Sequence, residues 1–150
     1  MTRHAILATF GSFVLAALAA HATAAGQSAP PPTLDFEFFK TRVQPIFYAK
    51  RPGHARCVSC HVAGTPLRLQ AFSSGTTWNE EESRKNFEAM KRVVMPGNEK
   101  SRLLVHPLAE KAGGDFFHNG GKHWSSQSDP EWQILRAWVL GDTKTRSEQR

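Results

Sequence analysis

A five-residue stretch, Cys57-Val58-Ser59-Cys60-His61, holds residue types whose spacing can do specific chemistry. Two thiols one helical turn apart can add to the two vinyl groups on one edge of a porphyrin. The histidine directly after the second cysteine can then bind the iron, as proximal histidines do in haem proteins. The C-x-x-C-H spacing therefore predicts covalent attachment of one c-type haem at Cys57 and Cys60, with His61 as the proximal iron ligand.

Other uses of the two cysteines fit the sequence less well. Two cysteines in the whole chain are too few for a disulfide scaffold or a four-thiolate zinc or iron–sulfur site. A thioredoxin-like pair would follow a strand in an α/β context, which the sequence lacks. A disulfide across two residues closes a very small loop and stabilises little. A zinc site at Cys57 and Cys60 finds no second ligand pair with finger spacing.

The second axial ligand of the iron has several candidates. Met95 stands in the chain's only Met-Pro pair, and His118 and His123 lie in the loop before the last predicted helix. Both thioether and imidazole groups bind haem iron, and a methionine would give the higher reduction potential. Another residue such as His106, or an open position that binds peroxide or a small gas, remains an alternative.

The basic segment 50–56 runs directly into this motif. Arg51, His54 or Arg56 could pair with the haem propionates, which need charge compensation if they are buried. The same charges could form a ring around the exposed haem edge that attracts an acidic redox partner. A solvated basic loop is the third interpretation.

Helices are expected to position these groups. Residues 34–47 place Phe36, Phe39 and Val43 at helical spacing, and Pro45 is expected to end or kink this helix. Thr77 and Glu80 have the spacing of a capping box. The helix that follows would carry Phe87, Met90 and Val94 on one face, and Pro96-Gly97 would stop it.

The C-terminal half predicts a short amphipathic turn or helix over residues 101–108 and a final helix after residue 129. Asp129-Pro130 supplies an N-cap and a proline at the first helical position, and Gly141 is a natural C-cap. Residues 112–128 form a long loop between them, which indicates a functional segment. Since no alternating strands appear, the predicted fold class is all-α, small and loop-rich.

The two ends of the chain predict export of one small domain. Residues 1–24 combine a basic start, an apolar run and a small-residue exit, the pattern of a secretory signal peptide. A Pro-rich linker is expected over residues 25–33, the folded domain over 34–141 and a polar tail over 142–150. The 150 residues carry a net charge of +6, but export makes nucleic acid a poor partner. No span is expected after signal cleavage, so the chain is predicted to be periplasmic or otherwise exported.

Several stretches occur in an order that resembles a known family. They are Val43-Gln44-Pro45-Ile46-Phe47, the motif at Cys57–His61, Pro96-Gly97-Asn98 followed by Ser101-Arg102-Leu103-Leu104, His118-Asn119-Gly120-Gly121, and the Trp-containing terminal helix. On these the chain resembles a monohaem cytochrome c domain. More narrowly, it is similar to the cytochrome c-like domains of exported planctomycete and acidobacterial proteins.

This resemblance implies a cytochrome c-like fold around a covalent haem, with the first and last helices packed together. It also implies electron transfer. An H-x-G-G segment occurs at the matching place in the resembling domains, so His118 is the predicted distal ligand. The two glycines of this segment, Gly120 and Gly121, would let the backbone approach the macrocycle closely.

The sequence thus predicts a single-electron carrier with haem c as its cofactor. Its expected partners are redox proteins, such as an exported dehydrogenase or a terminal oxidase. No acid/base pair, nucleophile constellation or nucleotide motif stands out, so no catalytic residues and no enzyme activity are predicted. A haem enzyme or a gas- or peroxide-binding protein with an open sixth site is the alternative.

Overall fold

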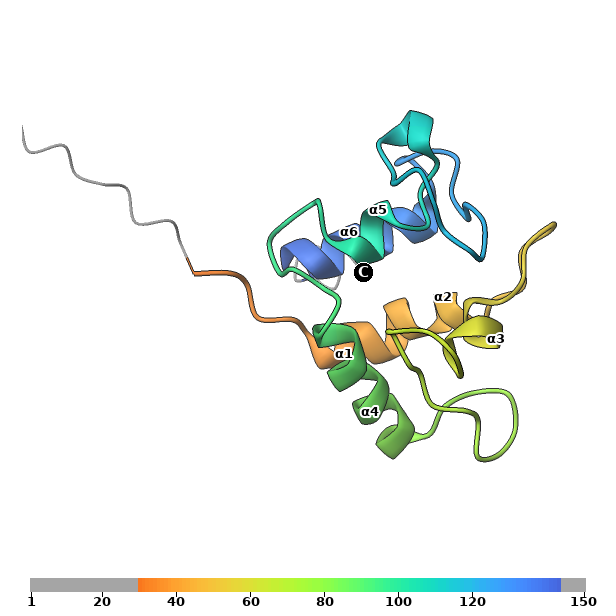
Figure 1. Cartoon of the computed structure of the whole chain (residues 1–150). Helices are drawn as coiled ribbons and strands as arrows, with labels where there is room; N and C mark the ends of the chain where they lie inside the picture. Colours follow the sequence, from red (N-terminus) through yellow and green to blue (C-terminus); the bar gives the residue numbers. More distant parts are fainter. Residues whose placement is uncertain (1–29, 144–150) are drawn as a thin grey trace, which may run out of the picture.

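The computed structural model describes residues 30–143, and this part of the chain is helical (Figure 1). The predicted signal peptide lies outside the described residues, as do most of the predicted linker and of the polar tail. The helical segments are α1 (Phe36–Phe38), η1 (Phe39–Val43), α2 (Gln44–Tyr48), α3 (Cys57–His61), α4 (Glu80–Lys91), α5 (Arg102–Val105), η2 (Glu110–Ala112) and α6 (Pro130–Leu140). Within residues 30–143 no strand forms beyond one isolated bridge, between Leu108 and Trp124. The all-α prediction is therefore confirmed for this region.

The N-terminal helix is continuous through α1, η1 and α2. Asp35 caps it by accepting a hydrogen bond from the Phe38 N–H at 2.9 Å. Pro45, expected to end or kink the helix, does not end it: the helix continues to Tyr48, and the turn before the proline is distorted. Proline lacks an N–H and its ring crowds the carbonyl four residues earlier. The turn before it widens into the π-helical η1, where the Gln44 N–H bonds to the Phe39 carbonyl, and this widening accommodates the ring.

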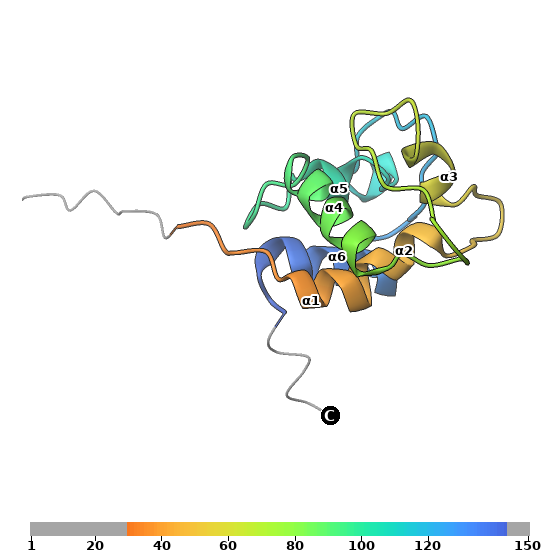
Figure 2. The same cartoon turned by 90° about the horizontal axis from the view of Figure 1, so that it is seen from below.

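The first and last helices pack against each other, as the resemblance implied (Figure 2). The rings of Phe39 and Trp138 lie 5.3 Å apart, and both side chains are fully buried. The Trp138 indole N–H donates to the Asp35 carbonyl at 2.8 Å, across 103 residues of sequence. This contact brings the two ends of the described chain together.

Helix α4 begins two residues later than predicted. Asn79, not Thr77, is the N-cap: its side chain accepts from the Glu82 N–H, and the Glu82 carboxylate accepts from the Asn79 N–H. Glu82 also accepts from the Ser73 N–H at 2.8 Å, so this capping box ties the preceding loop to the helix. The helix ends at Lys91, ahead of the Pro96-Gly97 pair expected to stop it.

The apolar face of α4 agrees with the predicted spacing. Met90 is fully buried, Val94 is buried just beyond the helix, and the Phe87 ring contacts those of Phe36 and Phe39 at 5.3 and 5.4 Å. Helix α4 therefore covers the N-terminal helix on a second side (Figure 2).

Helix α6 has the predicted caps. The Asp129 side chain accepts from the Glu131 N–H, Pro130 is the first helical residue, and Gly141 adopts the left-handed conformation with φ +79°. The long segment before it folds back on itself: the His123 N–H bonds to the Pro107 carbonyl and the Ala109 N–H to the Trp124 carbonyl, both at 2.8 Å. In residues 30–143 no helix has the length and apolar character needed to cross a membrane.

Candidate functional site

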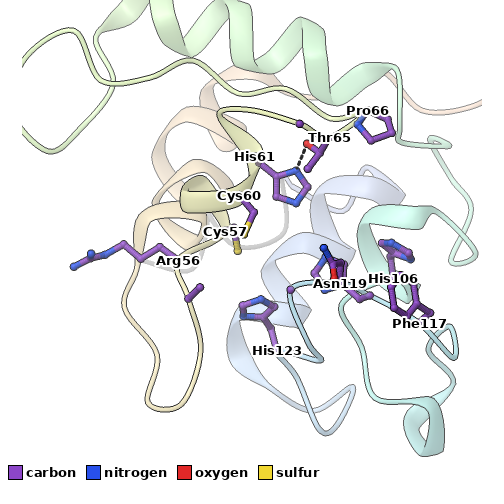
Figure 3. A pocket seen from close by; sticks show the side chains of 14 residues that line it. Arg56, Cys57, Cys60, His61, Thr65, Pro66, His106, Phe117, Asn119 and His123 are labelled. Atoms are coloured by element: carbon purple, nitrogen blue, oxygen red, sulfur yellow. Dashed lines mark hydrogen bonds between the residues drawn. The ribbon is translucent and has the colours of Figure 1, made fainter.

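A cleft separates helix α3 and the loop after it from the segment that folds back before α6 (Figure 3). It consists of two adjoining cavities of about 260 and 150 Å³. The residues that line both are Cys57, His61, Pro66, His106, His118 and His123. Together the cavities reach the ~300–1,000 Å³ typical of cofactor sites. The cleft thus joins the predicted attachment motif to the predicted distal segment.

Both cysteines face this cleft from α3. Cys57 is half-buried and Cys60 is exposed, and both are free thiols. Burial raises the pKa of the Cys57 thiol, and the nearby Arg51 guanidinium opposes this rise in part. Cys57 therefore keeps its proton at neutral pH, the form in which an S–H group adds across a vinyl double bond.

The loop after α3 fixes the orientation of His61. Its Nδ1 lies 3.1 Å from the Thr65 hydroxyl (Figure 3). The same atom lies 3.0 Å from the Leu67 carbonyl. Because a carbonyl only accepts, Nδ1 carries the proton and Nε2 keeps its lone pair. Metal-binding histidines in proteins are held by this kind of outer hydrogen bond. His61 is thereby set to bind a metal through Nε2.

His118 is held in the same way on the opposite wall. Its Nδ1 bonds to the Gly121 carbonyl, at the end of a turn in which the Gly121 N–H returns to the His118 carbonyl. Burial lowers the pKa of His118, which favours the neutral imidazole. Gly120 leaves room for the ring, since a Cβ there would lie 3.2 Å from His118 Cε1. His118 also offers a free Nε2 lone pair.

The imidazoles of His61 and His118 lie close to each other across the cleft. The ring centres of His61 and His118 are 6.5 Å apart, and the ring planes differ by 20°. Two metal–imidazole bonds of about 2 Å on opposite sides of an ion would separate the ring centres by about 6 Å. The described structure therefore brings together the predicted proximal and distal ligands, with a separation of ring centres close to that value.

Further histidines surround His118, which sequence reasoning did not place together. The His106 ring lies 4.8 Å from that of His118, and its Nδ1 contacts Asp115 Oδ2 at 2.8 Å. The His123 ring lies 5.8 Å from His118 and 4.9 Å from His54. Four of the five histidines among residues 30–143 thus line this cleft, and the fifth, His54, lies against His123. Their wide separation along the chain gave no local signal for this.

His123 lines the cleft with an unsatisfied polar atom. Its Nδ1 is buried and has no hydrogen-bond partner within the described residues. Burial, and to a smaller extent the charge of Arg51, lowers the pKa of His123 to about 4. His123 is accordingly neutral at physiological pH.

Met95, the methionine alternative, lies outside the cleft. It lines neither cavity, and 43% of its surface is exposed. The imidazoles are therefore the candidate axial ligands that the structure places at the site.

Two arginines of the basic segment before the motif have different surroundings. The Arg51 side chain is only 12% exposed. Its Nε donates to Glu131 Oε2 at 2.6 Å, and its Nη2 donates to the Ile46 carbonyl at 3.0 Å. It also lies over the Trp124 ring at 5.5 Å. Arg51 is thus a link between helices α2 and α6. Arg56 lines the larger cavity and remains a candidate partner for a propionate.

The donor set meets what a haem requires of a protein. Among residues 30–143, no group of three or more His, Cys, Asp or Glu side chains is arranged to hold a metal ion. A haem iron takes four ligands from the porphyrin and needs only two from the protein. Leu67, Leu103 and Phe47 supply apolar lining, and Arg102 adds a second cation at the smaller cavity.

Comparison with protein-family models, curated proteins and solved structures found no match to this chain.

Proposed function

We propose that this chain is an exported monohaem c-type cytochrome that carries single electrons between redox proteins. Cys57 and Cys60 would hold the haem through thioether bonds, and His61 and His118 would bind its iron. One observation carries the proposal: His118 faces His61 across the cleft at 6.5 Å, next to the free thiols of the C-x-x-C-H motif. We also propose that the chain has a cytochrome c-like fold, in which the terminal helices pack together.

The chain's residues would keep the iron's surroundings constant during electron transfer. When bound, the haem supplies a reversible one-electron change at its iron. The Leu67 and Gly121 carbonyls hold the Nδ1 protons of His61 and His118, so both imidazoles keep their orientation. Two imidazole ligands favour a lower reduction potential than a methionine–histidine pair would give.

The proposed location is based on the residue pattern of positions 1–24, and the proposed partners are based on the proposed haem site. Residues 1–24 have the pattern of a signal peptide, so the protein would act in the periplasm or outside the cell. Its partners would be redox proteins, such as an exported dehydrogenase or a terminal oxidase.

A haem enzyme, or a gas- or peroxide-binding protein, is the second candidate. One observation favours it: His106 and His123 crowd the same wall as His118, at 4.8 and 5.8 Å between ring centres. If His118 did not bind the iron, a small ligand at the open position would meet several imidazoles that can hydrogen-bond to it.

Covalent haem uptake tests the proposal. The full chain is produced with its signal segment in a host that has working haem-attachment machinery, and its intact mass is measured. We expect the mass of one haem to stay with the protein through acid–organic extraction. The Cys57→Ala/Cys60→Ala variant should lose it, whereas a His54→Ala control should keep it. Haem-free protein from a host that loads another c-type cytochrome would contradict the proposal.

A further inference from the structure

A second groove lies on the outer face of α4, away from the histidine cleft. It has a volume of about 440 Å³ and is formed between the loop at residues 66–70 and residues 84–92. Its charged lining consists of Arg68, Arg84, Lys85, Glu88 and Arg92. Pro66 is the residue that it shares with the cleft lining. The groove is therefore a separate surface with four cations and one carboxylate.

Two of these cations have no protein partner among the described residues. Arg84 bonds to Glu80 at 2.6 Å and lies over the Phe36 ring, and Lys85 bonds to Glu81 at 2.6 Å. Glu88 is bound by Lys91. Arg68 and Arg92 are exposed, and their guanidinium groups make no hydrogen bond or ion pair within residues 30–143. Their guanidinium groups remain available for carboxylate or phosphate oxygens, which they can bind in bidentate fashion.

The spread of the charges favours an extended ligand. Positions 84, 88 and 92 follow one face of a helix, and eight residues of α-helical rise correspond to about 12 Å. An extended ligand can contact charged side chains along that whole length. In an extended polypeptide, alternate side chains are about 7 Å apart on one side, so three or four acidic residues could span the groove.

We propose that this groove docks an extended acidic segment of a protein partner. Arg68 and Arg92 bind its carboxylates, and the ring-stacked Arg84 and Lys85 add to the positive potential. The binding is electrostatic and weakens as salt rises. This inference goes beyond the proposed haem function and does not depend on it, because the groove contains no haem-binding residue.

Binding of hexaglutamate to the full chain, as produced with attachment machinery, tests the proposal. We expect binding at low salt that perturbs the amide signals of residues 68–70 and 84–92 in NMR spectra. The Arg68→Gln/Arg92→Gln variant should bind about tenfold more weakly or worse, since charge-assisted hydrogen bonds are lost. The matched control Lys100→Gln/Lys111→Gln removes two exposed charges outside the groove and should bind as the wild type does.

Three results would overturn the proposal. Hexaglutamate could fail to bind at low salt, or both double variants could weaken it equally, which would indicate net charge alone. Inorganic phosphate could bind as tightly and compete, which would assign the groove to a small anion. Haem content is measured on the same samples, so a loss of haem uptake, which concerns the proposed function, is distinguished from a loss of peptide binding.

Discussion

His61 and His118 are each anchored through Nδ1 to a backbone carbonyl, Leu67 for one and Gly121 for the other. This arrangement leaves the Nε2 atom of each ring unprotonated, with a lone pair that can bind a metal. It also means that the two imidazoles are oriented by loops rather than by helices. Small changes in those loops should therefore alter the ligation of the proposed haem iron.

Gly120→Ala should weaken the distal ligand. The new Cβ would lie 3.2 Å from His118 Cε1, which is tight enough to push the ring away. Gly120 has no positive φ, so alanine adds crowding without backbone strain. We expect partial carbon monoxide binding to the ferrous variant, measured by absorbance.

Gly53→Ala is the control, because Gly53 has φ +73° and open space around its Cβ. It should change stability and leave the carbon monoxide reaction as in the wild type. Equal reactivity of the two variants would contradict the role given to Gly120.

His123 should stay neutral between pH 5 and 8. Its pKa is lowered from 6.5 to about 4 by burial and by Arg51. The unfolded chain therefore binds this proton first, and the free energy of unfolding falls as the pH drops from about 6.5 to about 4. NMR signals of the ring in the diamagnetic ferrous protein measure the protonation.

The His123→Gln variant tests the same point through stability. It should lose part of the acid dependence of urea unfolding, because it has no proton to take up on unfolding. A His123 signal that titrates near pH 6.5 would show that the ring is not desolvated.

The site could be predicted from the sequence where its residues are contiguous. Cys57, Cys60 and His61 stand in one motif, and the structure places all three at the cleft. The convergence of His106 and His123 on His118 could not be predicted, because it depends on how residues 106–124 fold back through backbone bonds such as His123 to Pro107. No local pattern encodes such long-range pairing.

At the scale of single elements, the start of helix α4 shows how local patterns can compete. Thr77 and Asn79 each precede a glutamate by three residues, so both have capping-box spacing. The structure selects Asn79, whose partner Glu82 also binds the Ser73 N–H. That additional bond lies outside the spacing rule, which is why the sequence alone predicted the wrong residue.

Asn79→Ala should destabilise the protein by about 1 kcal/mol, the usual cost of removing an N-cap side chain. Thr77→Ala is the matched control and should change the free energy of unfolding by less than about 0.5 kcal/mol. Urea unfolding of both variants measures the difference. A larger loss of stability for Thr77→Ala than for Asn79→Ala would indicate that Thr77, not Asn79, is the N-cap of helix α4.

Helix α6 was predictable to its ends, in contrast to the N-terminal helix. Asp129, Pro130 and Gly141 are strong local signals, and each occupies its expected position. Pro45 is an equally strong signal, yet the helix passes through it by way of the π turn η1. Buried Phe39 and Val43 on that turn pack into the core, and this tertiary packing outweighs the local preference.

At the scale of the whole molecule, the contact between the first and last helices of the described residues holds together the two sides of the fold that carry the cleft. Trp138 is fully buried, contacts Phe39 and Phe87, and donates to the Asp35 carbonyl. Arg51 and Glu131 form a second link between the N-terminal helix and α6, close to Cys57.

Trp138→Ala should therefore destabilise the protein by about 3–5 kcal/mol, the range for truncating a large buried aromatic residue. Thermal unfolding followed by circular dichroism measures it. Phe116→Ala is the control, because 86% of the Phe116 surface is exposed, and its unfolding temperature should match the wild type. Equal unfolding temperatures for the two variants would contradict the packing described for the terminal helices.

The most direct test of the central claim is the optical spectrum of the haem-loaded protein and its reaction with carbon monoxide. For the wild type we predict low-spin, six-coordinate spectra in both oxidation states and no change of the ferrous spectrum with carbon monoxide. His118→Ala should become reactive, and Met95→Ala should remain like the wild type. A wild-type protein that binds carbon monoxide, or a Met95→Ala variant that gains this reactivity while His118→Ala does not, would contradict the account.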